Sequence, residues 1–345
     1  MPSPDISVWP PQDQAMWNCL FAKGSPLDER GALSHLRPTG AAPLKQAYRQ
    51  WVHWLQCSDP AALEREPEER ATITRLRQWC EARPDLRPMT RLFYIEGVLK
   101  VLCAFAPDAD WSAQRRLVKQ LKRLTGHGDR SRKAGRVLSS GVLLQAGIKH
   151  ASTHAKAKPT PLEAAMQFQM GTIVAMLALM PLRCVTFRRL ELGTSVHVDG
   201  KNVEITVPGD MMKTGHPWDA KVPDAVLPLL LRYLEEYRPW LMQRHRKRHN
   251  FLWVTNKGDP FKTGYFGVRV ALATTEATGV RVSPHLFRDA AATTLARMSP
   301  QSARLIKPVL AHSCTETAED HYIHAGSIEA GRNHAALIRN LRKRA

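Results

Sequence analysis

Hydrophobic residues in the first half of the chain recur with the period of an α-helix. Leu44, Tyr48, Trp51, Val52 and Leu55 are separated by four, three, one and three positions, which places them on one helix face. The same pattern predicts three further helices, over residues 68–80, 89–106 and 111–124. The first half of the chain is therefore predicted to be helical.

The chain is predicted to divide into an arm and two domains. Residues 1–43 are rich in proline, glycine and tryptophan and show no apolar period, which favours an irregular arm. Residues 126–135 are glycine-rich and basic, and a second break follows at 156–161, so we expect the domain boundary between Gly126 and Pro161. We divide the chain into the arm 1–43, a helical domain 44–155 and a C-terminal domain 156–345.

Alternation with period two predicts a small antiparallel sheet in the C-terminal half. Residues 196–198 and 203–207 each alternate apolar with polar side chains. Asp199-Gly200 lies between the two runs and is a recognised turn signal for a hairpin. A third short strand is predicted near residues 220–222.

The other elements of this half are predicted to be helices. Short and long helical patterns cover residues 137–150 and 162–182. Asp224 can cap a helix with an apolar face, and Ser283-Pro284 is typical of a helix start, with proline at the first helical position. The fold class is therefore predicted to be mainly α, with a helical N-terminal domain and an α+β C-terminal domain that holds a small antiparallel sheet.

Net charge indicates a polyanionic partner. The 345 residues include 50 lysines and arginines against 31 acidic residues, a formal charge of +19. Broad positive potential of this size favours DNA or RNA as the partner, with a membrane surface as the alternative. The longest apolar run, residues 172–182, is too short to span a bilayer, so no membrane partner is expected.

Cysteine usage and the N-terminus indicate a cytoplasmic protein. The six cysteines are scattered and form no Cys-x-x-Cys pair, which suggests neither a zinc site nor a disulfide framework. They are typical of reduced thiols in the cytosol. The first residues lack the charged and apolar regions of a signal peptide.

Six polar residues of the C-terminal half stand at the ends of predicted elements. An arginine ends the long apolar helix, a lysine lies in the loop after the second strand, and a His-x-x-Arg begins the capped helix. A histidine in Leu-Ala-His then precedes a tyrosine by ten residues. These candidate site residues are Arg183, Lys213, His285, Arg288, His312 and Tyr322.

In type and order, these six residues resemble the signature of the tyrosine recombinase, or phage integrase, family. The resemblance covers residues 160–345 by motif, and the helical first half is similar to the family's core-binding domain in general character. It implies that residues 44–155 form a core-binding domain that clamps DNA and that residues 156–345 form the catalytic domain.

Attack on a phosphodiester places negative charge on the non-bridging oxygens, which planar guanidinium groups match bidentately. Arg183 and Arg288 are the candidates for this role. His285 and Arg288 are three positions apart, so they share a helix face that we expect the protein to present to DNA.

The resemblance implies the remaining roles. Lys213 is the general acid that protonates the leaving 5′ oxygen, and His285 assists proton transfer from the tyrosine. His312 donates a hydrogen bond to the phosphate. Tyr322 is the nucleophile that forms a covalent 3′-phosphotyrosyl link.

The sequence departs from the family pattern at several positions. An acidic residue often stands three after the first arginine, but Thr186 stands here, so we expect less ordered packing around that arginine. Asp289 follows the His-x-x-Arg, where histidine is often found. His321 and His324 lie beside the tyrosine and leave open which histidine supports the phosphate.

Two basic runs, at residues 115–136 and 244–249, are candidates for phosphate contacts. The alternative for any such run is a solvated surface. The predicted DNA-binding residues are Arg115, Arg116, Lys119, Lys122, Arg123, Arg132, Lys133, Arg246 and Lys247.

The resemblance implies site-specific DNA recombination, by integration, excision or resolution, as carried out by mobile genetic elements. No metal or other cofactor is expected, because the phosphotyrosyl bond keeps the energy of the cut bond. The expected partners are double-stranded DNA and other recombinase subunits, in a homo-oligomer (a tetramer on paired sites) or with related proteins. Two alternatives remain: a type IB topoisomerase, which nicks and reseals one duplex, and a non-catalytic DNA-binding accessory protein of the same fold.

Overall fold

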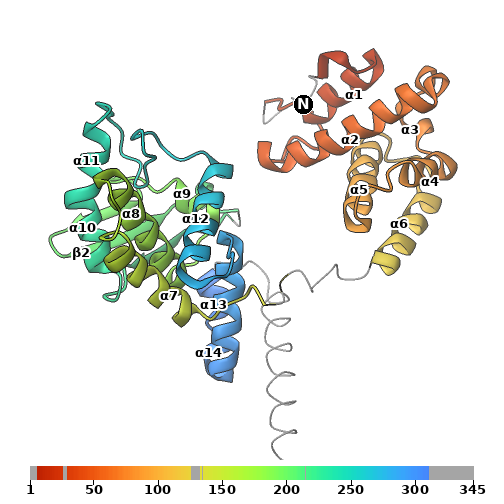
Figure 1. Ribbon diagram of the computed structural model, residues 1–345. Helices are drawn as coiled ribbons and strands as arrows, with labels where there is room; N and C mark the ends of the chain where they lie inside the picture. The colour runs from red at the N-terminus through yellow and green to blue at the C-terminus, as the bar shows by residue number, and fades with distance from the viewer. Residues whose placement is uncertain (1–5, 26–28, 126–132, 134, 214, 311–345) are drawn as a thin grey trace, which may run out of the picture. The chain divides into compact units, whose positions relative to one another are not determined.

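The computed structural model describes residues 6–25, 29–125, 133, 135–213 and 215–310 (Figure 1). Contacts between residues divide the chain into two compact units, Met1–Arg130 and Ser131–Ala345. This division falls inside the interval expected for the boundary, but the predicted limit after residue 155 is wrong. The predicted helix at 137–150 packs on the helix that follows it and shares its hydrophobic core, so it belongs to the second unit.

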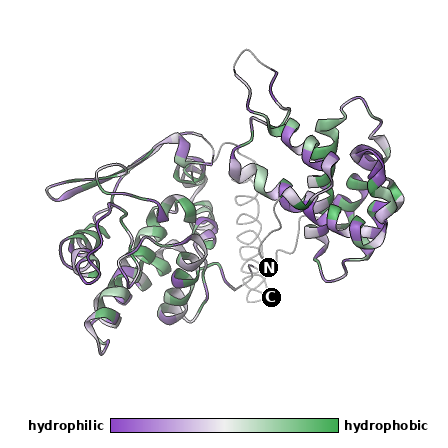
Figure 2. Ribbon diagram, turned by 90° about the horizontal axis from the view of Figure 1, so that it is seen from above, coloured by the Kyte–Doolittle hydropathy of each residue, from purple (hydrophilic) through white to green (hydrophobic). Residues whose placement is uncertain are grey.

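The first unit is helical, as predicted. Helix α2 (Pro38–Ser58) buries all five residues of the predicted apolar face. The other helices are α1 (Pro11–Phe21), α3 (Pro67–Arg70), α4 (Ile73–Glu81), α5 (Pro88–Phe105) and α6 (Ser112–Thr125), with 3-10 turns at Ile6–Val8 and Pro60–Glu64. Helix α5 packs against α2 and α6. Hydrophobic residues of α1, α2, α4, α5 and α6 form one buried cluster, and hydrophobic and hydrophilic residues are interspersed along these helices (Figure 2).

The prediction of an irregular arm over residues 1–43 is wrong. Helix α1 lies within it, and α2 already begins at Pro38. Aromatic packing explains why this segment folds. The ring centroids of Trp9 and Trp17 lie 5.3 Å apart, edge to face, and those of Trp9 and Tyr48 lie 5.4 Å apart. This segment is therefore part of the core of the first unit rather than an arm.

The predicted helix at 68–80 is interrupted. Helix α3 ends at Arg70, and α4 begins after Thr72, whose side-chain oxygen accepts a hydrogen bond from the backbone nitrogen of Arg75 at 3.3 Å. Arg70 is fully buried, which fixes the end of α3 in the core. The apolar period alone could not indicate this break, because the period continues through both short helices.

A buried ion pair holds α1, α2 and α3 together. Arg70 Nη1 lies 2.6 Å from an oxygen of Asp13, and neither side chain is exposed to solvent. Tyr48 donates a hydrogen bond of 2.6 Å to the other oxygen of Asp13. Burial, together with the neighbouring carboxylate, raises the pKa of Tyr48, so the phenol stays protonated and remains a donor. The carboxylate is thus matched by a cation and by a hydrogen bond.

We expect Asp13→Ala to lower the free energy of unfolding by about 3–5 kcal/mol, because it leaves the Arg70 guanidinium buried without its carboxylate. Denaturation of the full chain, followed by tryptophan fluorescence, measures the loss. Asp59→Ala, which removes the partly exposed ion pair with Arg75, is the control and should cost much less. Equal losses in the two variants would contradict a special role for the buried pair.

The second unit combines helices with one small sheet, as predicted (Figure 1). Its long helices are α7 (Ser140–Lys149), α8 (Pro161–Leu179), α12 (Thr263–Thr278) and α13 (Pro284–Met298). Shorter ones are α9 (Cys184–Arg188), α10 (Leu227–Arg232), α11 (Arg238–Gln243), α14 (Pro300–Ala303) and α15 (Ile306–Leu310), with π-helical turns at His150–His154 and Tyr233–Tyr237 and a 3-10 turn at Gly209–Met211. Helix α8 contacts α7, α12 and α13 and forms the centre of the core.

The sheet has the predicted strands in the order β1-β2-β3. Strands β1 (Val196–Asp199) and β2 (Asn202–Val207) pair antiparallel, and β3 (Trp218–Lys221) pairs antiparallel with β2. Gly200 in the first turn has a φ of 56°, a conformation that glycine adopts without strain. The loop between β2 and β3 is longer and carries Lys213.

Helix α8 is almost entirely buried. Every residue from Phe168 to Ala178 lies in the core. The helix is long and apolar enough to cross a membrane, but 72% of its apolar window is buried within the unit, as in the core helix of a globular domain. A Cβ on Gly171 would lie 2.4 Å from the backbone nitrogen of Ala151, so α8 and the π-helical turn after α7 meet with their backbones in contact.

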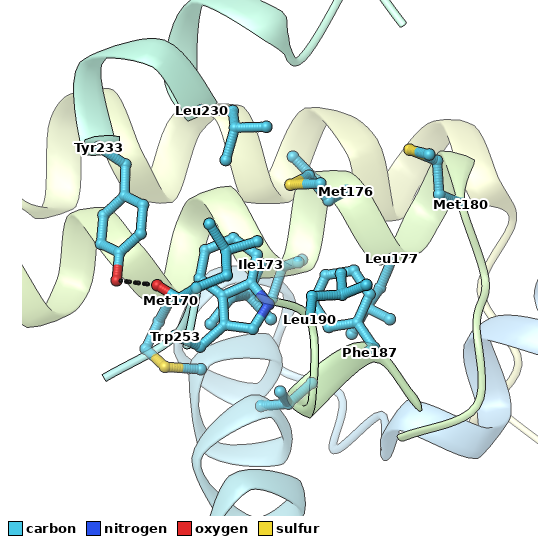
Figure 3. Packing of buried hydrophobic residues seen from close by; sticks show 14 of the residues in the cluster. Met170, Ile173, Met176, Leu177, Met180, Phe187, Leu190, Leu230, Tyr233 and Trp253 are labelled. Atoms are coloured by element: carbon cyan, nitrogen blue, oxygen red, sulfur yellow. Dashed lines mark hydrogen bonds between the residues drawn. The ribbon is translucent and has the colours of Figure 1, made fainter. Parts of the chain in front are cut away.

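The helix predicted to begin at Asp224 begins later. Val226, not Asp224, is the residue before α10, and the chain passes through the π-helical turn before α11. The predicted apolar face is nevertheless directed inward: Tyr233 is buried beside Trp253, with ring centroids 5.2 Å apart (Figure 3). The Tyr233 hydroxyl donates a hydrogen bond of 2.9 Å to the carbonyl of Leu252.

Candidate active site

Arg183 lies in a turn that two helices hold in place. Helix α8 ends at Leu179, and Arg183 is the residue before α9. Helix α9 is anchored by Phe187, which is buried and stacks on Trp253 with centroids 5.4 Å apart (Figure 3). The Arg183 side chain is half-buried, and its Nη1 atom has no hydrogen-bond partner among the described residues. Burial lowers the pKa of this guanidinium.

Arg288 joins three segments of the second unit. Its side chain is buried, with Nη1 donating to the carbonyl of Pro181 at 2.7 Å and Nη2 donating to the carbonyl of Leu310 at 2.6 Å. Pro181 lies two residues before Arg183, and Leu310 lies two residues before His312. One guanidinium on α13 therefore links the turn before α9 to the end of α15.

The two arginines form a concentrated positive charge. Burial, and then the charge of Arg183, lower the pKa of Arg288 to about 10, while Asp289 acts in the opposite direction. Both guanidinium groups remain charged near neutral pH, and an anion bound between them would relieve their mutual repulsion. A phosphate group has the charge and geometry for this.

The two residues that we expected α13 to present to DNA differ in exposure. His285 is exposed, but Arg288 is buried and bonded to backbone carbonyls. The spacing of three places both residues on one side of the helix. Because the turn at Pro181 covers only the second position, their exposure differs.

Lys213 lies in the loop between β2 and β3, as predicted, and is exposed. This loop is attached to the turn after Arg183 by Thr186. The buried Thr186 hydroxyl donates a hydrogen bond of 3.1 Å to the carbonyl of Met211. The Thr186 hydroxyl therefore links α9 to the lysine loop but does not contact Arg183, whose Nη1 atom has no hydrogen-bond partner among the described residues.

His285 stands at the start of α13 among several charges. Partial loss of water around the ring lowers the pKa of His285, and the positive charges of Lys133, Arg288 and Arg183 lower it further. Asp289 acts in the opposite direction. The imidazole therefore favours its neutral form, which can accept a proton.

Lys133 is engaged by a carboxylate. Its Nζ atom lies 3.0 and 2.9 Å from the two carboxylate oxygens of Asp289. The basic run indicates Lys133 only as a candidate for DNA contact. No pattern in the sequence indicates this pair, because the two residues are 156 positions apart.

The predicted DNA-binding residues fall in different settings. All five on α6 (Arg115, Arg116, Lys119, Lys122 and Arg123) are exposed. Lys122 forms an ion pair of 2.6 Å with Glu96. In the second basic run, Arg246 is exposed, and Lys247 pairs with Asp259 at 2.7 Å. These contacts with DNA remain predictions.

Three of the predicted site residues, Arg132, His312 and Tyr322, lie outside the described residues. In the part of the chain that the structure describes, no three histidine, cysteine or acidic side chains gather as they would around a metal ion.

Comparison with solved structures shows the fold of site-specific recombinases. The XerH site-specific recombinase bound to palindromic difH substrate, in a post-cleavage complex, matches with a TM-score of 0.59 and 15% identity over 87% of this chain and 79% of that chain. The Tn1549 transposon integrase in complex with transposon right-end DNA matches with a TM-score of 0.54 and 11% identity over 87% of this chain and 95% of that chain. No relative was found among the curated proteins. The model of the phage integrase family matches residues 148–327, more than half of the chain, and the chain therefore belongs to that family.

Proposed function

We propose that the protein is a site-specific DNA recombinase that cuts and rejoins DNA through a 3′-phosphotyrosyl intermediate at Tyr322. The observation that carries this proposal is the arrangement of Arg288. Its contacts with the carbonyls of Pro181 and Leu310 link the turn that carries Arg183 to the end of α15. Beside it, Arg183 keeps an Nη1 donor without a partner among the described residues. A buried donor next to a second guanidinium suits an anionic substrate.

We propose the following chemistry for the six candidate residues. The Tyr322 oxygen attacks the phosphorus while the bond from phosphorus to the 5′ oxygen breaks. His285 accepts the phenolic proton, and Lys213 gives a proton to the leaving 5′ oxygen. Arg183 and Arg288 stabilise the charge on the non-bridging oxygens, with His312 as a further donor. Attack by a 5′ hydroxyl then reverses the steps and joins the strands, and the covalent intermediate conserves the bond energy.

The partners follow from the reaction. XerH and the Tn1549 integrase were solved on DNA, and double-stranded DNA is the substrate proposed here. Exchange of strands between two duplexes requires several active sites, so we propose a tetramer of this chain, or of this chain with related recombinases, on paired sites. The first unit serves as the core-binding clamp and the second as the catalytic domain. The proposed site of action is the cytoplasm.

Covalent trapping tests the proposed function. The full chain is incubated with a pool of nicked duplexes from which the short 5′-hydroxyl fragment diffuses away after cleavage, so that rejoining fails. We expect a denaturant-resistant protein–DNA adduct that mass spectrometry maps to Tyr322. A topoisomerase would form the same adduct but would not join strands of two duplexes, and a non-catalytic accessory protein would form none.

The salt dependence of binding tests the role of α6. We expect alanine at Arg115, Arg116 and Lys119 to weaken DNA binding. Its salt dependence should become shallower by about 0.9 for each phosphate that the variant no longer neutralises, because fewer counterions are released. Titrations of the full chain with duplex DNA at several salt concentrations measure the slope.

The matched control replaces three exposed basic residues elsewhere in the first unit, Lys23, Arg30 and Arg77, with alanine. It changes the net charge equally and should leave the slope near that of the wild type. A wild-type slope in the α6 variant would mean that α6 does not contact DNA.

A further inference from the structure

The ion pair between Lys133 and Asp289 lies next to the candidate active site. Asp289 follows Arg288 directly on α13, and its side chain is only 8% exposed, whereas that of Lys133 is 48% exposed. A carboxylate this deeply buried requires a matching charge or hydrogen bonds. Lys133 provides such a charge from the start of the second unit, far from α13 in the sequence.

The position of Asp289 on α13 brings it close to His285. The two residues are four positions apart on one helix, so their side chains are neighbours on the same face. The carboxylate of Asp289 therefore lies beside the group proposed to accept the phenolic proton, and Lys133 lies beside that carboxylate.

We propose that Lys133 is a positioning residue for DNA cleavage: its ion pair with Asp289 fixes residue 133 against α13 and balances the negative charge next to His285. The consequence for cleavage rests on the proposed function, but the charge balance around His285 does not.

The charges around His285 have opposing effects. Asp289, on α13, favours the protonated imidazole. Three positive charges disfavour it: Arg288 on α13, Arg183 in the turn before α9 and Lys133 at the start of the second unit. Among the described residues, the opposing acid is thus Asp289. If Lys133 is removed, one of the three positive charges that oppose the effect of Asp289 on the imidazole is lost.

The two partners therefore have effects of opposite sign. Lys133→Met should raise the pKa of His285, and Asp289→Asn should lower it, each by roughly one pH unit. The double variant Lys133→Met/Asp289→Asn should return the pKa close to that of the wild type. A purely structural ion pair predicts another result, in which both single variants loosen the same contact and shift the histidine in the same direction or not at all.

Nuclear magnetic resonance titration of the imidazoles in the full chain measures this directly. Tyr322→Phe serves as the background, so the titration does not depend on cleavage, and the His285 signal is assigned by its disappearance in His285→Gln. Lys158→Met is the matched control, because Lys158 forms a similar ion pair of 2.7 Å with Glu276. It should leave His285 unchanged. Shifts of the same sign in both single variants, or no shift, would overturn the proposal.

The rate of cleavage gives a second measurement. A neutral His285 is needed to accept the proton, so the rate falls as the pH drops through its pKa. Lys133→Met should move this acidic limb to higher pH, and Asp289→Asn should move it to lower pH. If the titrations shift as expected but wild-type cleavage shows no acidic limb, the charge balance stands and the role proposed for His285 is wrong.

Discussion

Tyr322→Phe should abolish the covalent DNA adduct while DNA binding stays close to that of the wild type. The substitution removes only the hydroxyl that attacks phosphorus, and loss of a nucleophile lowers the rate of such reactions by several orders of magnitude. Denaturing gels of the trapped adduct measure cleavage, and titration with the same duplex measures binding. Tyr265→Phe, at an exposed tyrosine on α12, is the control and should form the adduct at the wild-type rate.

Two results would contradict this assignment. An adduct that persists in Tyr322→Phe would place the nucleophile on another residue. Cleavage that disappears when a chelator is added would indicate a metal-dependent nuclease, whereas the mechanism proposed here continues in the presence of the chelator.

Arg288→Lys should lower the cleavage rate by about 10²–10³-fold and affect DNA binding far less. Lysine keeps the charge, but a single ammonium group lacks the planar fork that reaches both Pro181 and Leu310 while facing a phosphate. The substitution should also lower stability, because a buried carbonyl without its donor costs roughly 1–3 kcal/mol. Arg288→Ala should have the same effects in stronger form.

Arg183→Lys separates catalysis from stability. Arg183 is half-buried, and its Nη1 atom has no protein partner among the described residues. We therefore expect the cleavage rate of Arg183→Lys to fall as in Arg288→Lys, while the melting temperature stays near that of the wild type.

Wild-type cleavage in Arg288→Lys would show that two guanidinium groups are not needed around the phosphate.

Periodic patterns predict the regular elements well, because the buried face of a helix or strand is formed by residues that are close together in the sequence. The face of α2, the hairpin at Gly200 and the start of α13 at Pro284 all follow from neighbouring residues. The break after Arg70 escapes such a pattern because Arg70 pairs with Asp13, a residue distant in the sequence and on another helix. Helix α1 escapes it because aromatic residues stabilise that helix from outside.

The sequence predicts where the described candidate residues lie in the secondary structure, but not what they contact. Arg183, Lys213 and His285 lie where the motif predicts them, at the ends of elements. Arg288 donates its hydrogen bonds to backbone carbonyls. Because every residue has such a carbonyl, the sequence cannot indicate which ones Arg288 contacts. Thr186 departs from the family pattern, yet its hydroxyl joins two parts of the site.

The contact between Arg288 and the end of α15 has a thermodynamic consequence. Leu310 precedes the part of the sequence that carries His312 and Tyr322, the proposed nucleophile, and its carbonyl is held by the guanidinium proposed to bind the phosphate. Binding of DNA and placement of this carbonyl are therefore coupled equilibria. The coupling is reciprocal. The free energy by which bound substrate stabilises the contact between Arg288 and Leu310 equals the free energy by which this contact strengthens substrate binding. Substrate binding at Arg288 and the placement of the end of α15 should therefore strengthen each other.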